Sequence, residues 1–375
     1  MSPLSLPPAL WVADTSMLQV LCERLAKNAS VAIDTESNSL HAYQERVCLI
    51  QLSDTQQDYL IDPLVGFDLS PLGVLLAEPG VEKVFHAAEY DVLCLHRDFG
   101  FTIKNIFDTM TAARVLGLPN LGLGALLGER FNLEIPKRFQ KADWAQRPLP
   151  ADMAQYAQTD THYLLALKAQ LEAELKEKDL LPLAREDFTR VEIALIPSNG
   201  HALHAAVRGQ HDLTAVQRAV LEELCVYRDT LARKLDRPLF KVLSDGILLA
   251  LAREQPHSQK EMQKIPDLSP RLLERHSSGL LKAVERGLKS KPISLPARPR
   301  LDDAHILRLE ALKQWRKKEA ASLGVLSDVV LPRDVLENIA RVNPDSRKML
   351  DNLMAEVPVR RKRFGHKILT VLKGL

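Results

Sequence analysis

The sequence predicts an α/β domain with a mixed sheet flanked by helices, followed by two all-helical domains. Three observations support this prediction. Strand-like and helix-like segments alternate over the first 190 residues, and proline-rich segments interrupt the chain near residues 197 and 292. The third observation is an internal repeat, in which a pattern at residues 221–281 recurs 88 residues later. A chain of 375 residues is long enough for three domains of ordinary size.

Hydrophobic runs predict the strands of the first domain, which we place at residues 1–200. The runs lie at residues 31–33, 47–52, 59–61 and 82–86. Short polar turns join the first three runs, so these strands are expected to pair antiparallel. The fourth run precedes a predicted helix at residues 88–98, which suggests a parallel crossover. Pro150, a suitable first-turn residue, is expected to begin one long helix that runs to about Lys178.

The repeat places one helical domain at residues 210–290 and another at residues 300–375. Leu221–Leu224 followed by Tyr227 recurs as Leu309–Leu312 followed by Trp315. Two copies are too few for a solenoid, so each is expected to be an independent domain. The segments Pro197–Gly200 and 291–299 are the predicted linkers.

The net charge of +2 is distributed unevenly along the chain. Residues 1–190 contain 17 lysines and arginines against 26 aspartates and glutamates, a net charge of −9, which leaves +11 for the remainder. A basic C-terminal half could offset the repulsion between an acidic half and a nucleic acid, although such asymmetry is also common without nucleic-acid binding. The glycines at 122, 124 and 128 are not followed by Lys-Ser or Lys-Thr, so ATP-driven helicase activity is not expected.

The four cysteines show no paired spacing and are expected to be free thiols in a reducing compartment. No apolar run approaches the roughly 20 residues that a membrane span requires. The N-terminus has neither a basic segment nor a sustained apolar segment of a secretion signal. We therefore expect a cytoplasmic protein without membrane contact.

Four carboxylates are the main candidates for chemistry. Asp34 follows a buried strand and stands two residues before Glu36, so both side chains leave the same face of the strand. Tyr156 and Asp160 stand four apart and share one face of the predicted helix. Asp91 lies on the helix after the fourth strand. Taken singly, Asp34 and Glu36 could be an exposed strand-end pair, Asp91 and Asp160 solvated helix residues, and Tyr156 a core residue.

Three segments carry a resemblance to the DEDD exonucleases, in the subgroup with a catalytic tyrosine. They are Ile33–Glu36, Phe85–Leu93 and Tyr156–Asp160. Two more, Ile106–Thr109 and Asp143–Leu149, make the chain similar to the bacterial ribonuclease D family. The two helical repeats resemble the HRDC domain. After Glu36 the chain departs from the pattern of many ribonucleases D, because residues 37–43 lack an aromatic residue followed by a basic stretch.

The resemblance implies a ribonuclease H-like fold and a 3′–5′ exoribonuclease that binds two Mg²⁺ or Mn²⁺ ions. It implies that Asp34 bridges both ions, that Glu36 and Asp160 complete the nucleophile side, and that Asp91 serves the leaving-group side. Tyr156 would orient the attacking water. The implied substrates are tRNA precursors or other small structured RNAs with a single-stranded 3′ end, shortened to nucleoside 5′-monophosphates. The HRDC-like domains would hold nucleic acid.

Three further residues are candidates for substrate binding. His86 could contact a phosphate or sugar or could be structural, Phe107 could stack on a base or lie in the core, and Arg147 could contact a phosphate. Asp108 is expected first as an N-cap of the next helix. The run Arg360–Arg363 is expected to be a solvated helix face, although four adjacent cations would also suit a phosphate backbone.

Two other functions remain open at this point. A DNA 3′–5′ exonuclease of repair would need the same metal cluster, because only contacts to the 2′-hydroxyl distinguish ribose from deoxyribose. A catalytically silent nucleic-acid-binding scaffold would keep the fold, but the presence of all four carboxylates together with Tyr156 argues against it.

Overall fold

The computed structural model describes residues 6–136, 138–193, 202–295 and 302–375. The chain divides into two compact units, one with residues 1–37, 47–195 and 300–375 and the other with residues 38–46 and 196–299. The C-terminal helical repeat therefore shares a compact unit with the α/β domain. The linker predicted at Pro197–Gly200 and the end of the 291–299 linker lie outside the described residues.

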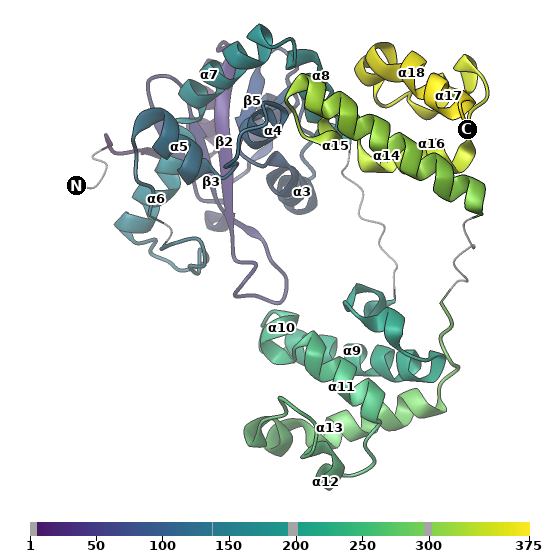
Figure 1. The fold of residues 1–375 in the computed structure, drawn as a ribbon. Helices are drawn as coiled ribbons and strands as arrows, with labels where there is room; N and C mark the ends of the chain where they lie inside the picture. Colours follow the sequence, from purple (N-terminus) through teal and green to yellow (C-terminus); the bar gives the residue numbers. More distant parts are fainter. Residues whose placement is uncertain (1–5, 137, 194–201, 296–301) are drawn as a thin grey trace. The chain divides into compact units, whose positions relative to one another are not determined.

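A six-stranded mixed sheet forms the centre of the α/β domain, with strand order β1-β4-β3-β2-β5-β6 (Figure 1). The strands are β1 (Leu10–Val12), β2 (Ser30–Ser37), β3 (Val47–Ser53), β4 (Asp58–Ile61), β5 (Glu82–Phe85) and β6 (Ile106–Asp108). The β2–β3 and β3–β4 pairs are antiparallel, and the β1–β4, β2–β5 and β5–β6 pairs are parallel. The predicted mixed sheet is confirmed. Only the three-residue strands β1 and β6 were not anticipated, because so short a strand shows no periodicity.

Helices cover both faces of the sheet. They are α1 (Thr15–Leu25), η1 (Pro63–Val65), α2 (Ser70–Ala77), α3 (Ala88–Phe99), α4 (Thr109–Val115), α5 (Leu123–Phe131), α6 (Ala151–His162), α7 (Leu164–Glu177) and α8 (Leu181–Ile193). The apolar residues of α1, α2 and α3 pack with Ile33 and Ile50 on one face. Tyr156 and Ala157 of α6 pack with Leu49 and Leu60 on the other. All seven residues of β3 are buried, as expected for a central strand between two helical layers.

The single helix predicted from Pro150 to Lys178 is two helices, α6 and α7, separated at Tyr163. Two threonines precede the break. Thr159 donates its hydroxyl to the carbonyl of Gln155, and Thr161 is buried and hydrogen-bonded to Ser53 of β3. Threonine hydroxyls that bond to backbone or sheet partners compete with regular helix geometry and bend it. The sequence periodicity continues across this point, so it does not reveal the break.

The two helical repeats have the same element order at a constant offset of 88 residues. The first contains α9 (Ala215–Leu235), α10 (Leu239–Val242), α11 (Asp245–Glu254), α12 (Gln259–Met262) and α13 (Pro270–Lys289), after the short turns η2 (Leu203–Ala206) and η3 (Gln210–Asp212). The second contains α14 (Asp303–Leu323), α15 (Ser327–Val330), α16 (Arg333–Val342), α17 (Arg347–Leu353) and α18 (Pro358–Lys373). Within the described ranges, no helix is both long and apolar enough to cross a membrane.

Equivalent residues of the two repeats make equivalent contacts. Arg228 donates to the carbonyl of Leu243, and Arg316, 88 positions later, donates to the carbonyl of Leu331. Both bonds tie the first helix of a repeat to the residue after its second helix. The sequence repeat therefore reflects a repeated three-dimensional structure and not only a similar composition.

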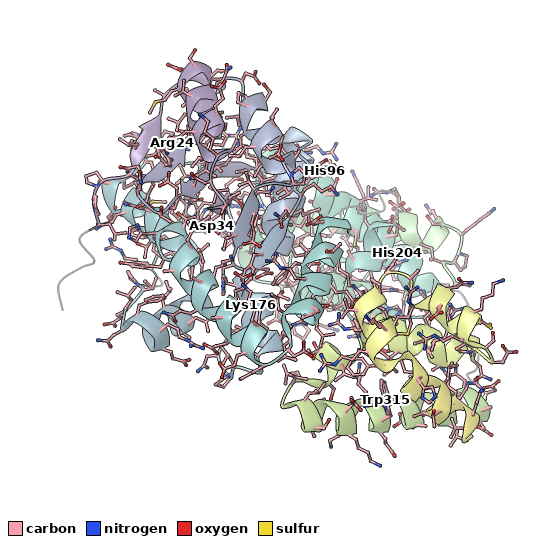
Figure 2. The ribbon with its side chains drawn as sticks, turned by 90° about the horizontal axis from the view of Figure 1, so that it is seen from above. Arg24, Asp34, His96, Lys176, His204 and Trp315 are labelled. Carbon is pink, nitrogen blue, oxygen red and sulfur yellow. The ribbon has the colours of Figure 1, made fainter. Side chains whose placement is uncertain are left out.

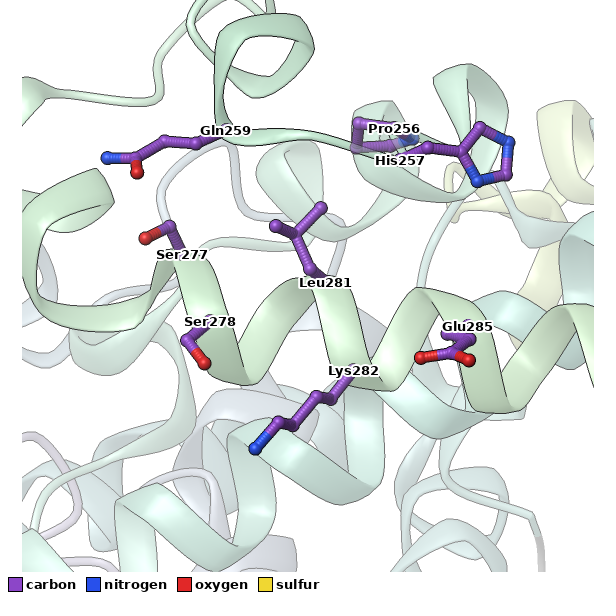
Figure 3. A pocket seen from close by; sticks show the side chains of 8 residues that line it. All are labelled: Pro256, His257, Gln259, Ser277, Ser278, Leu281, Lys282 and Glu285. Atoms are coloured by element: carbon purple, nitrogen blue, oxygen red, sulfur yellow. The ribbon is translucent and has the colours of Figure 1, made fainter.

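One difference between the repeats opens a pocket of about 450 Å³ on the first (Figure 3). Its lining is Pro256, His257, Gln259, Ser277, Ser278, Leu281, Lys282 and Glu285. In the second repeat Arg347 replaces Gln259, and its guanidinium lies 3.1 Å from the position that a β-carbon on Gly365 would occupy. The two repeats therefore differ at this place, where the first has Gln259 and Ser277 and the second has Arg347 and Gly365.

The C-terminal repeat packs against the α/β domain through a buried ion-pair network. Arg360 of α18 is fully buried and forms ion pairs with Glu186 and Asp187 of α8, at 2.5 and 3.0 Å. Its Nε also donates to the carbonyl of Val329 at 3.0 Å. Arg363 donates to the carbonyl of Asp179, which precedes α8. The expectation that Arg360–Arg363 form a solvated face is therefore wrong for Arg360, which is an internal contact of this unit.

Candidate active site

β2 carries the first two carboxylates at the edge of the sheet where the parallel strands end. Asp34 and Glu36 point to the face that α6 covers, and Thr35 between them points to the opposite face. The β2–β5 ladder ends at the pair Ala32–Val84, so Asp34 on β2 and His86 after β5 stand two residues beyond it. The carboxyl ends of parallel strands are the usual location of ligand sites in α/β sheets.

Helix α6 brings the third carboxylate onto this face. Asp34, Glu36 and Asp160 each offer a carboxylate oxygen, and the three oxygens lie within 4.8 Å of one another. All three side chains keep partial solvent exposure. Asp34, labelled in Figure 2, lies in the α/β domain, whereas Trp315 marks the C-terminal repeat. The structure thus brings Asp34 and Glu36 of strand β2 together with Asp160 of helix α6.

Asp91 reaches the site from the other face of the sheet. It lies in the first turn of α3 and accepts hydrogen bonds from the backbone nitrogen of Thr35, at 3.1 Å, and from the Thr35 hydroxyl. Asp91 is 5% exposed, whereas Glu89 two residues earlier is exposed. The structure therefore distinguishes Asp91 from the neighbouring glutamate by burial, and Thr35 is a site residue that the sequence alone does not reveal.

A strained turn and its anchor position α3. Ala87, the N-cap of α3, has φ of 64°, a left-handed conformation that is unfavourable for alanine. Asp108 accepts hydrogen bonds from the backbone nitrogens of Ala87 and Ala88, at 3.0 and 3.2 Å. It also accepts from Met110 and Thr111 and so caps α4, as expected from sequence. One buried carboxylate thus fixes both the turn that places Asp91 and the start of the next helix.

The carboxylates raise one another's pKa. Burial, with repulsion by Asp91, Asp160 and Glu36, holds the pKa of Asp34 well above its ordinary range. Burial, with the same kind of repulsion, raises the pKa of Glu36 and brings that of Asp160 to about 7. Burial also raises the pKa of Asp91 to about 7, against the hydrogen bonds from Thr35. Such converging negative charge is stable when a cation neutralises it.

Tyr156 is held beside this cluster by aromatic contacts. Its ring centroid lies 5.6 Å from that of Phe139 and 6.2 Å from that of Trp144. Burial, with repulsion by the carboxylates at 160, 36 and 34, raises the pKa of the Tyr156 hydroxyl above its ordinary value. The hydroxyl is therefore protonated near neutral pH. It can donate or accept a hydrogen bond but cannot act as a phenolate base.

Thr109 orients His86, and burial favours the neutral form of its ring. The Thr109 hydroxyl donates to the carbonyl of Phe85, so its oxygen accepts from Nδ1 of His86, 2.9 Å away. This assignment leaves Nε2 of His86 without a hydrogen. Burial lowers the pKa of His86, although Asp108 opposes the shift. An acceptor nitrogen suits a sugar hydroxyl better than a phosphate.

The other two predicted substrate contacts have structural surroundings. Phe107 is fully buried, with its ring centroid 4.8 Å from that of Phe188, and it lies in the core and not in the site. Arg147 uses all five of its N–H donors internally. Two go to Asp62, at 2.6 and 2.7 Å, and three go to the carbonyls of Cys48, Trp144 and Gln146. Arg147 therefore pins the segment that carries Trp144 to the sheet.

The donor set at the site fits a hard divalent cation. Mg²⁺ and Mn²⁺ prefer carboxylate oxygen and water, and three carboxylates converge here without a lysine or arginine ion pair among the described residues. Their raised pKa values show that the protein alone does not neutralise the cluster. Asp34, Glu36 and Asp160 are the residues that could hold such an ion, with Asp91 available on the other side of β2.

Two family models match the chain. Residues 10–176 match a family model described as 3′–5′ exonuclease, and residues 217–284 and 307–372 each match the HRDC domain. The first match contains all four carboxylates and Tyr156. The two HRDC matches fall on the two helical repeats, in agreement with the constant offset between them.

Relatives of known identity match over most of the chain. Ribonuclease D of Pseudomonas paraeruginosa is 28% identical over 98% of this chain and 98% of its own length. Protein RRP6-like 2 of Arabidopsis thaliana is 30% identical over 76% of this chain, which spans only 35% of that longer protein. The crystal structure of Escherichia coli RNase D, an exoribonuclease involved in structured RNA processing, has the same fold, with a TM-score of 0.70 and 24% identity over 94% of this chain and 100% of that one.

The family matches agree with the structure of the chain. The carboxylate cluster lies within the matched exonuclease region, and the C-terminal half consists of the two matched HRDC domains. The chain therefore has a 3′–5′ exonuclease domain followed by two HRDC domains, and it is similar to a ribonuclease D over nearly its full length.

Proposed function

We propose that this protein shortens the 3′ ends of tRNA precursors or other small structured RNAs and releases nucleoside 5′-monophosphates by hydrolysis that uses two metal ions. The convergence of Asp34, Glu36 and Asp160 within 4.8 Å is the observation that carries the proposal. When bound, two divalent ions supply an activated water and stabilise the leaving oxygen. The involvement of Escherichia coli RNase D in structured RNA processing supports the substrate class.

The residues of the chain have distinct roles in this proposal. Asp34 would contribute its carboxylate to both ions, the role that the resemblance to DEDD exonucleases implies. Glu36 and Asp160 would hold the ion on the α6 face, and Asp91, whose carboxylate accepts from Thr35, would serve the leaving-group side. Tyr156 keeps its proton near neutral pH and holds the attacking water in line by a hydrogen bond.

His86 is the proposed contact for the sugar. Its Nε2 is an acceptor, because Nδ1 donates to the hydroxyl of Thr109. A ribose 2′-hydroxyl can donate to this nitrogen, whereas deoxyribose cannot. The proposal therefore favours RNA over DNA at the substrate nucleotide nearest the carboxylate cluster. Phe107, which lies in the core, and Arg147, whose donors are all engaged, are not available as substrate contacts.

The first helical repeat is the better candidate for gripping RNA. In the second repeat Arg360 is buried, Arg363 is bound to Asp179, and Lys367 forms an ion pair with Glu319 at 2.6 Å. Those cations are engaged within the protein. In the first repeat, by contrast, exposed cations of α10 and α13 on the corresponding side have no acidic partner within 4.0 Å in the described part of the chain.

The repeat register identifies the face concerned. Arg271 and Arg275 of the first repeat occupy the positions of Val359 and Arg363, which contact Glu186 and Asp179 of the α/β domain. Lys241 occupies the position of Val329, whose carbonyl accepts from Arg360, and all three cations of the first repeat are exposed. Phe240 beside Lys241 is 54% exposed. Cations with an exposed aromatic ring are the usual composition of a surface for single-stranded nucleic acid. We define Phe240, Lys241, Arg271 and Arg275 as the basic face of the first repeat.

We infer a cytoplasmic location. The four cysteines are buried and free, and burial raises the pKa of both Cys22 and Cys225 to about 12. Such thiols are unreactive packing residues, typical of proteins that do not depend on disulfides. The ribonuclease D relative from Pseudomonas paraeruginosa supports the same inference.

One experiment tests the proposed activity. A stem-loop RNA with a labelled 5′ end and a single-stranded 3′ tail is incubated with purified protein in Mg²⁺, Mn²⁺ or EDTA, beside a DNA of the same sequence and the Asp34→Asn variant. We expect stepwise shortening of the RNA tail with release of nucleoside 5′-monophosphates, no reaction in EDTA, and none with Asp34→Asn.

Three other outcomes of this experiment would contradict the proposal, and each points to a different explanation. Equal or faster shortening of the DNA would indicate a DNA exonuclease. Binding of the RNA without shortening under every metal condition would indicate a silent scaffold. Near-normal activity of Asp34→Asn in Mg²⁺ would show that the metal assignment is wrong.

A further inference from the structure

A fully buried glutamine next to Asp34 has no hydrogen-bond partner. Gln51 is 0% exposed, and neither its Nε2 nor its Oε1 has a partner in the structure. Among the described residues it alone leaves two side-chain polar atoms unpaired in this way. A buried amide that makes no hydrogen bond loses the full hydration of both groups, so such a residue calls for an explanation.

The strand register places Gln51 at the metal cluster. Gln51 of β3 is the direct antiparallel partner of Asp34 on β2, and direct partners point to the same face of a sheet. Their β-carbons are therefore about 5 Å apart. On its other side Gln51 is paired with Leu60 of β4. The amide group thus lies between an apolar neighbour and the carboxylate proposed to bridge the ions.

The residues before and after Gln51 show which helix covers it. Leu49, two positions earlier, packs with Tyr156 and Ala157 of α6. Ser53, two positions later, donates a hydrogen bond to the hydroxyl of Thr161 of the same helix, at 2.7 Å. Gln51 therefore lies beneath the turn of α6 that carries Asp160. Its side chain faces the carboxylate cluster from the sheet. Because its neighbours Leu49 and Leu60 are apolar, an ordinary core position here would hold a leucine and not a glutamine.

We propose that Gln51 is a positioning residue of the metal site, whose amide makes its hydrogen bonds only when the site is occupied. Nε2 then donates to the Asp34 carboxylate, and Oε1 accepts from water that is held with the ions. Carboxylates that bind metals are commonly oriented by such outer partners. The inference rests on the proposed function, because it assumes the metal cluster at Asp34.

The test compares two buried glutamines in the full-length protein. Gln51→Met keeps the length of the side chain and removes the amide. Gln158→Met is the matched control, because Gln158 is also buried but its Nε2 donates to Asp58 and to the carbonyl of Pro7, at 2.6 and 2.7 Å. Mn²⁺ binding is measured by calorimetry, and melting temperature is measured in EDTA.

We expect Gln51→Met to bind Mn²⁺ about 10- to 100-fold more weakly than wild type while its melting temperature in EDTA is unchanged or higher. Its turnover should recover as Mn²⁺ is raised. Gln158→Met should melt at a lower temperature in EDTA and bind Mn²⁺ with wild-type affinity once folded.

Two results would overturn the inference. In one, Gln51→Met binds Mn²⁺ as tightly as wild type. In the other, it lowers the melting temperature in EDTA as Gln158→Met does, which would make Gln51 a structural residue that holds a permanent buried water. Failure of the wild-type protein itself to bind Mn²⁺ is a different outcome, because it contradicts the proposed function.

Discussion

Arg360 and Asp187 form an ion pair at 3.0 Å in which the guanidinium is fully buried, and this pair joins the C-terminal HRDC domain to the exonuclease domain. Glu186 completes the network by accepting from Arg360 and from the backbone nitrogen of Val359. In the first HRDC domain Leu272 occupies the position equivalent to Arg360. The two repeats therefore share a fold, but the first lacks the arginine through which the second packs on the exonuclease domain.

The first prediction concerns this network. Arg360→Met should lower the free energy of unfolding of the unit that contains the exonuclease domain and the second repeat by about 3–5 kcal/mol. Glu186 would stay buried without an ion-pair partner, and Asp187 would keep only Arg114, 3.6 Å away. Thermal melting and limited proteolysis of the full-length protein measure the effect. Arg361→Met is the control, because Arg361 is partly exposed and lies 4.0 Å from Asp351, so its replacement should change stability by less than about 1 kcal/mol. Equal melting of the two variants would contradict the prediction.

The sequence predicted the carboxylate cluster because its members lie within short motifs whose spacing puts them on one face of an element. Asp34 and Glu36 follow from strand alternation, and Tyr156 and Asp160 follow from helix periodicity. It did not predict the partners that depend on tertiary register. Thr35 holds Asp91 across 56 residues, and no local pattern encodes that pairing.

The same limit explains the errors at charged residues. Arg147 and Arg360 look like phosphate contacts in sequence, because an arginine beside proline or within a basic run is most often exposed. Their acidic partners, Asp62 and Asp187, are 85 and 173 residues away. Only the folded chain shows that these cations are already neutralised.

The second prediction follows from the raised carboxylate pKa values. The folded protein without metal keeps protons on Asp91 and Asp160 up to a pH of about 7, whereas the unfolded chain loses them near pH 4. This contribution to stability is therefore complete below about pH 4 and is lost as the pH rises through about 7. In EDTA the melting temperature should fall between about pH 6 and pH 8, and less so in Asp160→Asn.

Metal binding should reverse this dependence. An ion displaces the protons, so Mg²⁺ should raise the melting temperature more at about pH 8 than at about pH 6. Calorimetry at about pH 6.5 in buffers of different ionisation enthalpy should show release of protons on binding. Binding without proton release at that pH would mean that the carboxylates are already ionised in the metal-free protein.

The third prediction concerns the hydroxyl of Tyr156. Tyr156→Phe removes the group that orients the attacking water but keeps the ring contacts with Phe139 and Trp144. Turnover should therefore fall by roughly 10² or more, while Mn²⁺ affinity stays near that of wild type. Tyr163→Phe is the control, since this partly buried tyrosine contacts His162 and not the cluster. An unchanged turnover number for Tyr156→Phe would make Tyr156 a core residue only.

The fourth prediction concerns the basic face of the first repeat. Replacing Lys241, Arg271 and Arg275 by alanine should weaken binding of an RNA with a single-stranded tail. Each phosphate contact that the variant loses should make the slope of log affinity against log salt shallower by about 0.7. Loss of three contacts should therefore reduce the magnitude of the slope by about 2. Binding is measured over a salt series in EDTA, in which hydrolysis does not occur.

A matched set of changes in the second repeat tests whether position matters beyond charge. Lys317, Lys318 and Lys348 are also exposed and have no acidic partner within 4.0 Å in the ranges that the structure describes. Replacing these lysines by alanine removes the same charge. The three lysines lie outside the face through which the second repeat packs on the exonuclease domain. This control should retain most of the wild-type affinity and slope. If both triple variants bound RNA equally weakly, net charge and not the basic face would govern RNA binding.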